Sequence, residues 1–453
     1  MKARILGVIL LASMPACSEG AGSAGRDARG SAKNLLLITI DTLRADRVGW
    51  MGYERDTTPL LDARAVEGQV FEAAIAQAPW TRPSIATLMT GLHPSTVGLT
   101  CHNFRVPKGE CDVLPQSMTT LAETLRGVGH RTAGFVANIN VDPIFGFDQG
   151  FREYVSISEL LSAEDPDWRM KNTWKSGGTE LLTDRAIQWL DGGGGDEPFF
   201  LYLHYLDPHE PYDPPAEDAA LFPVASYGEG KTPAMEAAYD AEIHFVDREL
   251  ERLFARLDRD GLWETTAVLI VSDHGEEFEE HGGWYHGYTV FDEQLRVPML
   301  AWWPGIEPGR FGEQVRILDV MPTVLDLLGV APASPLQGRS LLPLVRGEAW
   351  SEDGALSELG YRPLASFRSP PWKLIVNEAT GDVQLFDVER DPAETADLAA
   401  ENPGVVAELL ERRRELALAN EGLGSNFERD AAGVSISPEQ IERLEALGYV
   451  DGE

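Results

Sequence analysis

The sequence predicts an α/β protein with one large, mostly parallel sheet sandwiched by helices and a small C-terminal α+β subdomain. Short apolar runs recur along the chain, and amphipathic helical patterns separate them. This alternation is typical of parallel strands joined by crossover helices. From about Glu352 onward, shorter strand-like segments and a turn replace it. The 453 residues exceed the roughly 250 to 300 at which a single core stops growing, so two unequal parts are expected.

The individual elements follow from the length and flanks of the apolar runs. Strands buried on both faces are expected at residues 34–40, 131–136, 199–205, 266–272 and 297–303. An apolar stripe at helical spacing, from Tyr239 to Leu257, predicts a long helix before the fourth of these strands. Further on, residues 372–377 and 383–388 flank a Gly381 turn and predict a hairpin. Helices are expected at 405–419 and 438–447.

The first 17 residues have the composition of an export signal. Lys2 and Arg4 precede the apolar run 5–11, and small residues lead to Cys17. This order resembles a bacterial lipoprotein cleavage site, which would leave Cys17 as a lipidated first residue. An ordinary secreted or periplasmic protein is the alternative. Because no later segment reaches the roughly 18 apolar residues that span a bilayer, we expect a periplasmic or cell-envelope lipoprotein whose anchor at Cys17 is its only membrane contact.

The remaining chain divides by composition. A Gly-, Ser- and Ala-rich linker at 18–33 leads into a main domain at 34–346, and residues 347–453 form the C-terminal subdomain with a helical tail. Besides Cys17 the chain has Cys101 and Cys111, which could close a short loop in an oxidising compartment. We expect a disulfide there, with two unpaired buried thiols as the alternative.

The net charge of −35 restricts the class of partner. A phosphate polymer would meet net repulsion, and no basic stripe offsets it, so nucleic-acid binding is excluded. An anionic substrate would need local positive charge. Bound divalent metal ions can supply that charge where side chains do not.

Polar residues follow three of the predicted strands at the point where each strand ends. Asp41 follows the first, His209 lies in the loop after 199–205, and Asp273 with His274 follows 266–272. In sheets of this kind ligands bind beyond the carboxyl ends of the strands. An adjacent carboxylate and imidazole, with Gly275 turning the backbone away, suit a divalent cation. A capped turn with a salt bridge is the alternative.

A hydroxyl stands at the start of a predicted helix in the segment 81–91. Pro83 suits a first helical position, so Thr81 is expected to cap the exposed backbone amides. That location favours a developing alkoxide, and Thr81 is a candidate nucleophile. The alternative is an ordinary helix cap.

These motifs resemble those of the sulfatase family, within the alkaline phosphatase superfamily. The segment 81–91 is similar to its active-site signature, and Asp273-His274-Gly275-Glu276 is similar to its metal motif. Thr81 stands where the family has the residue converted to formylglycine, which resembles the branches that use an unmodified Thr. The resemblance implies a metal site of Asp41, Thr81, Asp273 and His274. Thr42 replaces a second Asp, so zinc or manganese is favoured, with calcium possible.

Further site residues are implied by the same resemblance. The loop Asp207-Pro208-His209 is similar to one that carries an active-site His, and His286 has the spacing from His274 seen in the Thr-using transferases. Either histidine could protonate the leaving oxygen or hold a second cation. Ile85 replaces the family's Arg, and residues 135–140 lack its Lys and His pair. Arg82, or a second metal ion at His209 and His286, would then have to neutralise the oxyanion.

The predicted function is metal-dependent hydrolysis of sulfuric or phosphoric esters, with a covalent intermediate on Thr81. A phosphoryl or phosphoethanolamine transferase is one alternative, and a non-catalytic exported binding protein is another. In the C-terminal subdomain, Lys373 fits a solvated strand lysine better than a substrate contact.

Overall fold

The computed structural model describes residues 32–99, 110–157, 159–160, 178–193, 197–351, 353–428 and 434–435. The expected export signal with Cys17, the Cys101 end of the expected disulfide and the expected helix at 438–447 lie outside these residues, and the Cys111 side chain is not described either. Within the described part of the chain, no helix is both long enough and apolar enough to cross a bilayer.

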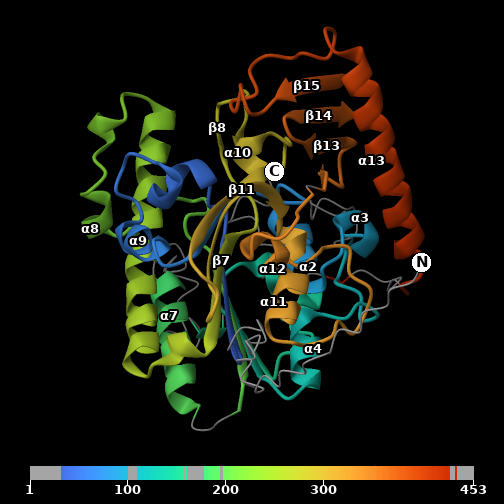
Figure 1. The fold of residues 1–453 in the computed structure, drawn as a ribbon. Coiled ribbons are helices and arrows are strands. Elements are labelled where there is room, and N and C mark those ends of the chain that lie inside the picture. The colour runs from blue at the N-terminus through green and yellow to red at the C-terminus, as the bar shows by residue number, and fades with distance from the viewer. Residues whose placement is uncertain are drawn as a thin grey trace, which may run out of the picture.

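The centre of the protein is an eight-stranded sheet, which confirms the predicted fold class (Figure 1). In spatial order its strands are β11 (Gly309–Arg316), β2 (Gln69–Ile75), β10 (Arg296–Trp302), β7 (Thr266–Ser272), β1 (Asn34–Ile40), β6 (Phe199–Tyr205), β4 (Arg131–Val136) and β5 (Glu153–Ser156). Every neighbouring pair is parallel except the two pairs made by β10. All five predicted strands are present, and the last begins one residue earlier than expected.

Helices cover both faces of this sheet because strand side chains alternate between the faces. One face packs against α2 (Thr81–Thr90), α4 (Leu121–Gly127) and α11 (Val320–Leu327), and the other against α1 (Pro59–Ala65), α7 (Gly178–Gly192) and α9 (Lys231–Arg259). Shorter helices are α3 (Pro94–Val97), α8 (Ala216–Ala219), α10 (Asp292–Leu295) and α12 (Leu342–Val345). The 3₁₀ turns are η1 (Ala45–Arg47), η2 (Gly49–Met51), η3 (Ile139–Val141), η4 (Pro143–Phe145), η6 (Val224–Ser226), η7 (Leu262–Glu264) and η8 (Ile317–Asp319). Two-residue strands are β3 (Glu110–Cys111), β8 (Glu277–Phe278), β9 (Trp284–Tyr285) and β16 (Val434–Ser435).

A second, four-stranded antiparallel sheet forms the C-terminal region. It consists of β12 (Ala355–Glu358), β13 (Leu364–Ser369), β14 (Trp372–Asn377) and β15 (Val383–Asp387). The long helix α13 (Pro403–Gly424) packs against it through a separate small core (Figure 1). The predicted hairpin is therefore the β14–β15 half of a larger sheet.

Lys373 on β14 is buried, so the expectation of a solvated lysine is wrong. Its ammonium lies 2.7 Å from Asp292 Oδ1 and 2.8 Å from Glu394 Oε1, and Arg368 Nε lies 3.5 Å from Asp292 Oδ2. We call Lys373, Asp292, Glu394 and Arg368 the interface cluster, because Asp292 in α10 precedes β10 of the large sheet while Lys373 and Arg368 belong to the small one. Its two cations neutralise buried carboxylates that come from other segments.

The register of the three central strands aligns their carboxyl ends. Thr39 of β1 lies beside His204 of β6, and Ile40 of β1 lies beside Ser272 of β7. By alternation, His204, Asp41 and Asp273 continue the row of side chains that faces α2. The fold therefore delivers polar groups from adjacent strands to one place in front of the start of α2.

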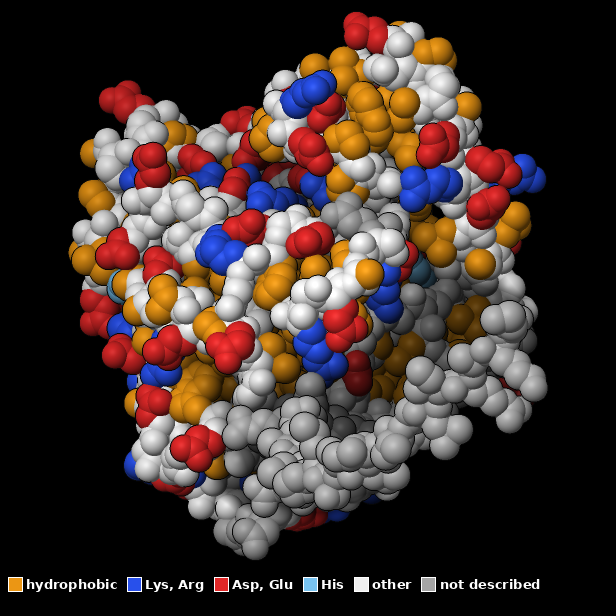
Figure 2. Space-filling view, viewed as in Figure 1, with side chains coloured by type: hydrophobic (Ala, Val, Ile, Leu, Met, Phe, Trp, Pro, Cys, Tyr) orange, Lys and Arg blue, Asp and Glu red, His pale blue; other side chains and the backbone are white. Residues whose placement is uncertain are grey.

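Charges on the surface are mixed. On the face shown in Figure 2, acidic side chains are spread among lysines and arginines, and the described residues there form no continuous basic band. A surface that carries charges of both signs in this way favours solubility.

Candidate active site

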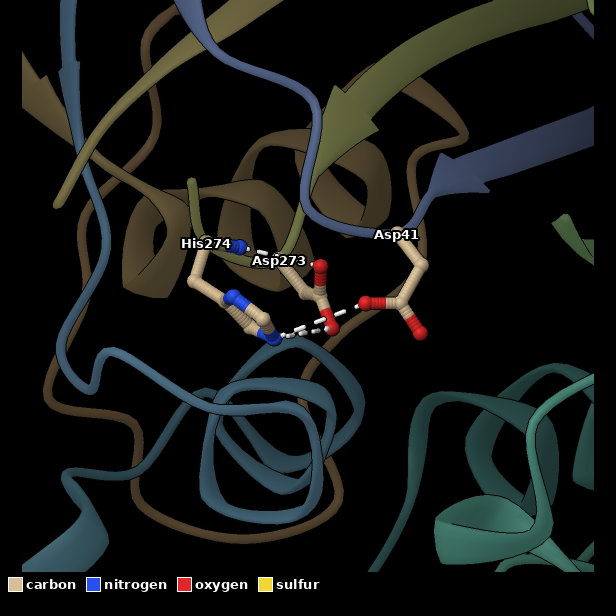
Figure 3. Close-up of side chains that lie close together, drawn as sticks. All are labelled: Asp41, Asp273 and His274. Carbon is tan, nitrogen blue, oxygen red and sulfur yellow. Dashed lines mark hydrogen bonds and ion pairs between the residues drawn. The ribbon is translucent and has the colours of Figure 1, made fainter. Parts of the chain in front are cut away.

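Asp41, Asp273 and His274 converge at the carboxyl ends of β1 and β7 (Figure 3). Their ligand atoms lie within 4.8 Å of one another, and all three side chains are buried. His274 Nε2 is 3.5 Å from Asp41 Oδ1 and 3.4 Å from Asp273 Oδ2. The three residues predicted as metal ligands from strand ends therefore come together in the folded chain.

The hydrogen bond of the other ring nitrogen fixes the tautomer of His274. Nδ1 lies 3.0 Å from the carbonyl oxygen of Gly275, and a carbonyl can only accept, so Nδ1 carries a proton. In the neutral ring, Nε2 presents a lone pair to two carboxylates. Three electron-rich groups facing one another in a buried space repel, and a cation between them turns the repulsion into attraction.

The surroundings of the two carboxylates support the same conclusion. Asp41 Oδ1 and Asp273 Oδ2 are buried without a hydrogen-bond partner, and within the described chain neither carboxylate is paired with a lysine or arginine. Burial, and next the charge of Asp273, raise the pKa of Asp41 well above its ordinary value. The donor set of two carboxylates and one imidazole fits a divalent transition metal ion.

Thr81 is the first residue of α2, which corrects the expected helix start by two residues. Trp80 occupies the N-cap position with extended backbone angles, φ −161° and ψ 156°. Pro83 is tolerated at the third position because amides of the first turn have no intrahelical partner. The Thr81 hydroxyl does not serve as the N-cap. It lies 3.3 Å from His274 Nε2 and accepts a 3.3 Å hydrogen bond from Asn138 Nδ2.

Asn138 links the hydroxyl to the carboxylates. Its Nδ2 also donates to Asp41 Oδ2 at 2.5 Å, and its Oδ1 accepts from the amide of Asn140. The side chain is buried and follows the end of β4. Like Asp41 and Asp273, it therefore fits the strand-end rule, by which site residues lie just beyond the carboxyl ends of the strands. Asn138 was not predicted as a site residue, because an amide in the segment 135–140 does not replace the family's Lys and His pair.

Thr42 holds the turn that follows β1. Its φ of 55° is a left-handed conformation that β-branched residues rarely adopt. This backbone directs the Thr42 amide to Asp273 Oδ1 at 3.3 Å, while Tyr239 donates its hydroxyl proton to the Thr42 carbonyl oxygen at 2.7 Å. The strained turn thus ties the ends of β1 and β7 together next to the cluster.

His209 and His286 lie on the other side of His274. The His286 ring centroid is 4.5 Å from that of His274 and 4.8 Å from that of His209. His286 Nδ1 is 3.0 Å from Glu276 Oε1, and Tyr212 donates to Glu276 Oε2 at 3.0 Å. Burial raises the pKa of Glu276 to about 8. Glu276 belongs to the motif that resembles the family's metal motif, but no role for it was predicted from the sequence.

His209 is held by its own loop. Nδ1 donates to the backbone carbonyl of Glu210, which leaves the lone pair on Nε2. Burial, and next the nearby His286, lower the pKa of His209 well below its ordinary value. The ring is therefore neutral at physiological pH. Both histidines predicted from the family resemblance lie near the metal-ligand candidates.

Arg82 is buried and directed toward the turns after β4. Its Nη2 donates to Asn140 Oδ1 at 2.9 Å, and the guanidinium lies 3.9 Å from the Phe145 ring centroid. Through Asn140 and Asn138 it connects to the Thr81 hydroxyl, so its described contacts place it beside the site and not on the hydroxyl itself.

His204 on β6 lies beneath the metal-ligand candidates and was not predicted as a site residue. Its Nε2 is 3.8 Å from Asp41 Oδ2 and 4.0 Å from Asp273 Oδ2. Burial lowers the pKa of His204 to about 4, so the ring is neutral. Its signal in the sequence is a single imidazole inside the apolar run 199–205.

Comparisons with known proteins identify the family of the chain. The family model described as sulfatase matches residues 33–330, and the model of the C-terminal part of N-sulphoglucosamine sulphohydrolase matches residues 279–417. The chain is 26% identical to choline-sulfatase of Rhizobium meliloti over 82% of this chain and 83% of that protein. It is 28% identical to the multifunctional alkaline phosphatase superfamily protein PehA of Trinickia caryophylli, over 69% and 77% of the two chains.

Solved structures share the architecture. The yidJ protein of Bacteroides fragilis superposes with a TM-score of 0.73 at 20% identity, over 90% of this chain and all of the other. At this identity the match concerns the fold alone. Because the sulfatase model spans well over half of the sequence, the chain belongs to the sulfatase family of enzymes that hydrolyse sulfuric or phosphoric esters.

Proposed function

We propose that this enzyme hydrolyses its ester with the Thr81 hydroxyl as nucleophile, at a centre where Asp41, Asp273 and His274 hold a divalent cation. One observation carries the proposal: Thr81 Oγ1 lies 3.3 Å from His274 Nε2, the point on which both carboxylates also converge. The lone pair on that nitrogen and the unpaired carboxylate atoms fit zinc or manganese better than calcium.

A divalent ion at this centre lowers the pKa of a hydroxyl and neutralises an anionic ester. Residues of the chain orient the nucleophile and stabilise the charge that develops. Asn138 orients the Thr81 oxygen by donating to it, and the amides at the start of α2 face the negative charge that develops there. Thr81 Oγ1 loses its proton to water and bonds to sulfur or phosphorus, while the bond to the leaving oxygen breaks and that oxygen takes up a proton.

His286 is placed to give a proton to the leaving oxygen, or to hold a second cation together with His209, whose neutral ring keeps its lone pair on Nε2. Glu276 fixes the orientation of His286 through Nδ1, and the Glu210 carbonyl does the same for His209. Arg82, held by Asn140, adds the positive charge that Ile85 does not provide. General acid catalysis of this kind contributes roughly 10² to 10⁴ in rate.

Phosphoric esters suit this nucleophile better than sulfuric esters. A formylglycine enzyme expels sulfate from a geminal diol, whereas Thr81 has one oxygen on its β carbon and would keep a sulfate group. A phosphothreonine can instead be cleared by a second in-line attack from water. The likeness to PehA favours the same class, while the likeness to choline-sulfatase favours sulfuric esters.

Thr81→Ala tests the nucleophile. The zinc- or manganese-loaded variant is expected to lose at least about 10³-fold in kcat on phosphate and sulfate mono- and diesters, because the covalent route is closed. It should still bind the ion through the remaining ligands. Intact mass after rapid quenching should show one added phosphoryl or sulfuryl group on the parent and none on the variant.

Thr87→Ala is the matched control, since Thr87 is another buried threonine of the same helix whose hydroxyl has no partner. It should keep parental turnover. Turnover by Thr81→Ala equal to that of Thr87→Ala would remove Thr81 as the nucleophile.

A further inference from the structure

His204 is an unexplained buried imidazole. It is 0% exposed on a strand whose other inward side chains are apolar or aromatic, and neither ring nitrogen has a hydrogen-bond partner. An imidazole hidden from water without a partner costs free energy, so its place in this strand calls for a ligand. Alternation along β6 sends it to the same face as Asp41 and Asp273.

The same two carboxylates lie near both imidazoles, at somewhat longer distances from His204. His204 Nε2 is 3.8 Å from Asp41 Oδ2 and 4.0 Å from Asp273 Oδ2, whereas His274 Nε2 is 3.5 Å from Asp41 Oδ1 and 3.4 Å from Asp273 Oδ2. All four exceed the roughly 3.2 Å limit of an N–H···O hydrogen bond. They are shorter than the roughly 4.3 Å that two metal–ligand bonds can span. Each pair of atoms is therefore close enough for both to bind one ion.

We infer that His204 is a fourth protein ligand, which approaches the proposed cation from the floor of the site. The inference rests on the proposed metal centre and extends it by one residue. Asp41 and Asp273 would then lie between two imidazoles, one from β6 and one after β7. A second nitrogen ligand strengthens the preference for a transition metal over calcium or magnesium.

The experiment counts imidazoles on the ion. The full-length protein is loaded with one equivalent of zinc, and X-ray absorption at the zinc edge measures the imidazole shell. We expect two imidazoles in the parent and one in His204→Gln. Chelator competition should show zinc affinity about 100-fold weaker in this variant, at or beyond the loss seen for outer-shell partners.

His93→Gln is the matched control. His93 is also buried with neither ring nitrogen partnered, but it follows α2, about 15 Å of helix beyond Thr81. It should keep two imidazoles and parental affinity. Equal counts and affinities in His204→Gln and His93→Gln would overturn the assignment of His204.

Two further outcomes separate this inference from the proposed function. A parent that binds zinc with a single imidazole overturns the role of His204 and leaves the centre intact. A parent that binds no zinc or manganese overturns both. If His204→Gln does not fold, His209→Gln and His286→Gln decide: two imidazoles retained in both variants support His204, and a loss in either overturns it.

Discussion

Two groups of buried carboxylates in this protein are neutralised in opposite ways. The interface cluster contains its own cations, because Lys373 contacts both Asp292 and Glu394. The strand-end cluster, which we define as Asp41, Asp273, His204 and His274, contains within the described chain no lysine or arginine paired with either carboxylate. Both groups are buried, so burial alone does not distinguish a structural cluster from a functional one.

The pKa values of one carboxylate from each group, Asp292 and Asp41, are shifted in opposite directions. Burial opposes ionisation of Asp292, but the charge of Lys373 outweighs it and lowers the pKa to about 2. At Asp41 burial and the charge of Asp273 act in the same direction and raise the pKa. The comparison teaches that the proposed ion would supply to Asp41 and Asp273 the positive charge that Lys373 supplies to Asp292.

The largest expected effect comes from Asp273→Asn. Turnover should fall at least about 10³-fold with the loss of the bound ion, which corresponds to roughly 4 kcal/mol of transition-state stabilisation. In chelator, however, its free energy of unfolding should equal or exceed that of the parent, because one of two repelling charges is gone. Urea unfolding with and without chelator measures this. A free energy of unfolding well below that of the parent in chelator would contradict the proposed contrast between the two groups of carboxylates.

The same change at the interface cluster should have the opposite consequence. Asp292→Asn is expected to lower the free energy of unfolding by about 3 kcal/mol, because it leaves Lys373 and Arg368 with less compensating charge. Zinc bound per folded molecule should stay at the parental level. Urea unfolding and metal analysis of the purified variant check both values, and a stability unchanged within 0.5 kcal/mol would contradict the proposed role of the cluster.

The smallest expected effect is a pH dependence. Because the pKa of Asp41 is raised, its contribution to metal-free stability is present below its ordinary value of 3.8 and is lost as pH rises through the raised pKa. A bound cation should cancel that loss. At 100 times Kd, zinc adds about 2.7 kcal/mol, and its affinity should increase with pH as Asp41 releases a proton. Calorimetry in buffers of different ionisation enthalpy counts that proton.

The strand-end rule predicted much of the site but only where a polar residue follows a strand. Asp41, Asp273 and His274 satisfy the rule and were found. His204 lies inside its strand, where a run of buried residues gives no reason to separate an imidazole from the core. Asn138 satisfies the rule, but it was not predicted because a neutral amide does not replace the positive charge that the family has in this segment.

Two other expectations, the exposure of Lys373 and the start of α2, were wrong for different reasons. Lys373 looked solvated because its strand is short, and its partner Asp292 is 81 positions away in the chain. The start of α2 was misjudged because Pro83 signals a first turn without specifying which residue of that turn it occupies. The fold class was predictable because apolar periodicity is local, whereas the burial of Lys373 depends on tertiary contacts.

The proposed metal ligands lie far apart in the sequence, and this separation has a consequence for biosynthesis. Thr42 and Asp273, which the strained turn joins, are 231 positions apart, and β1 can pair with β7 only after most of the chain has been made. The cluster is therefore completed late, and an ion has little to bind before the central sheet closes. Adding zinc should therefore leave the refolding rate unchanged and slow unfolding, because the proposed ion would stabilise only the folded state.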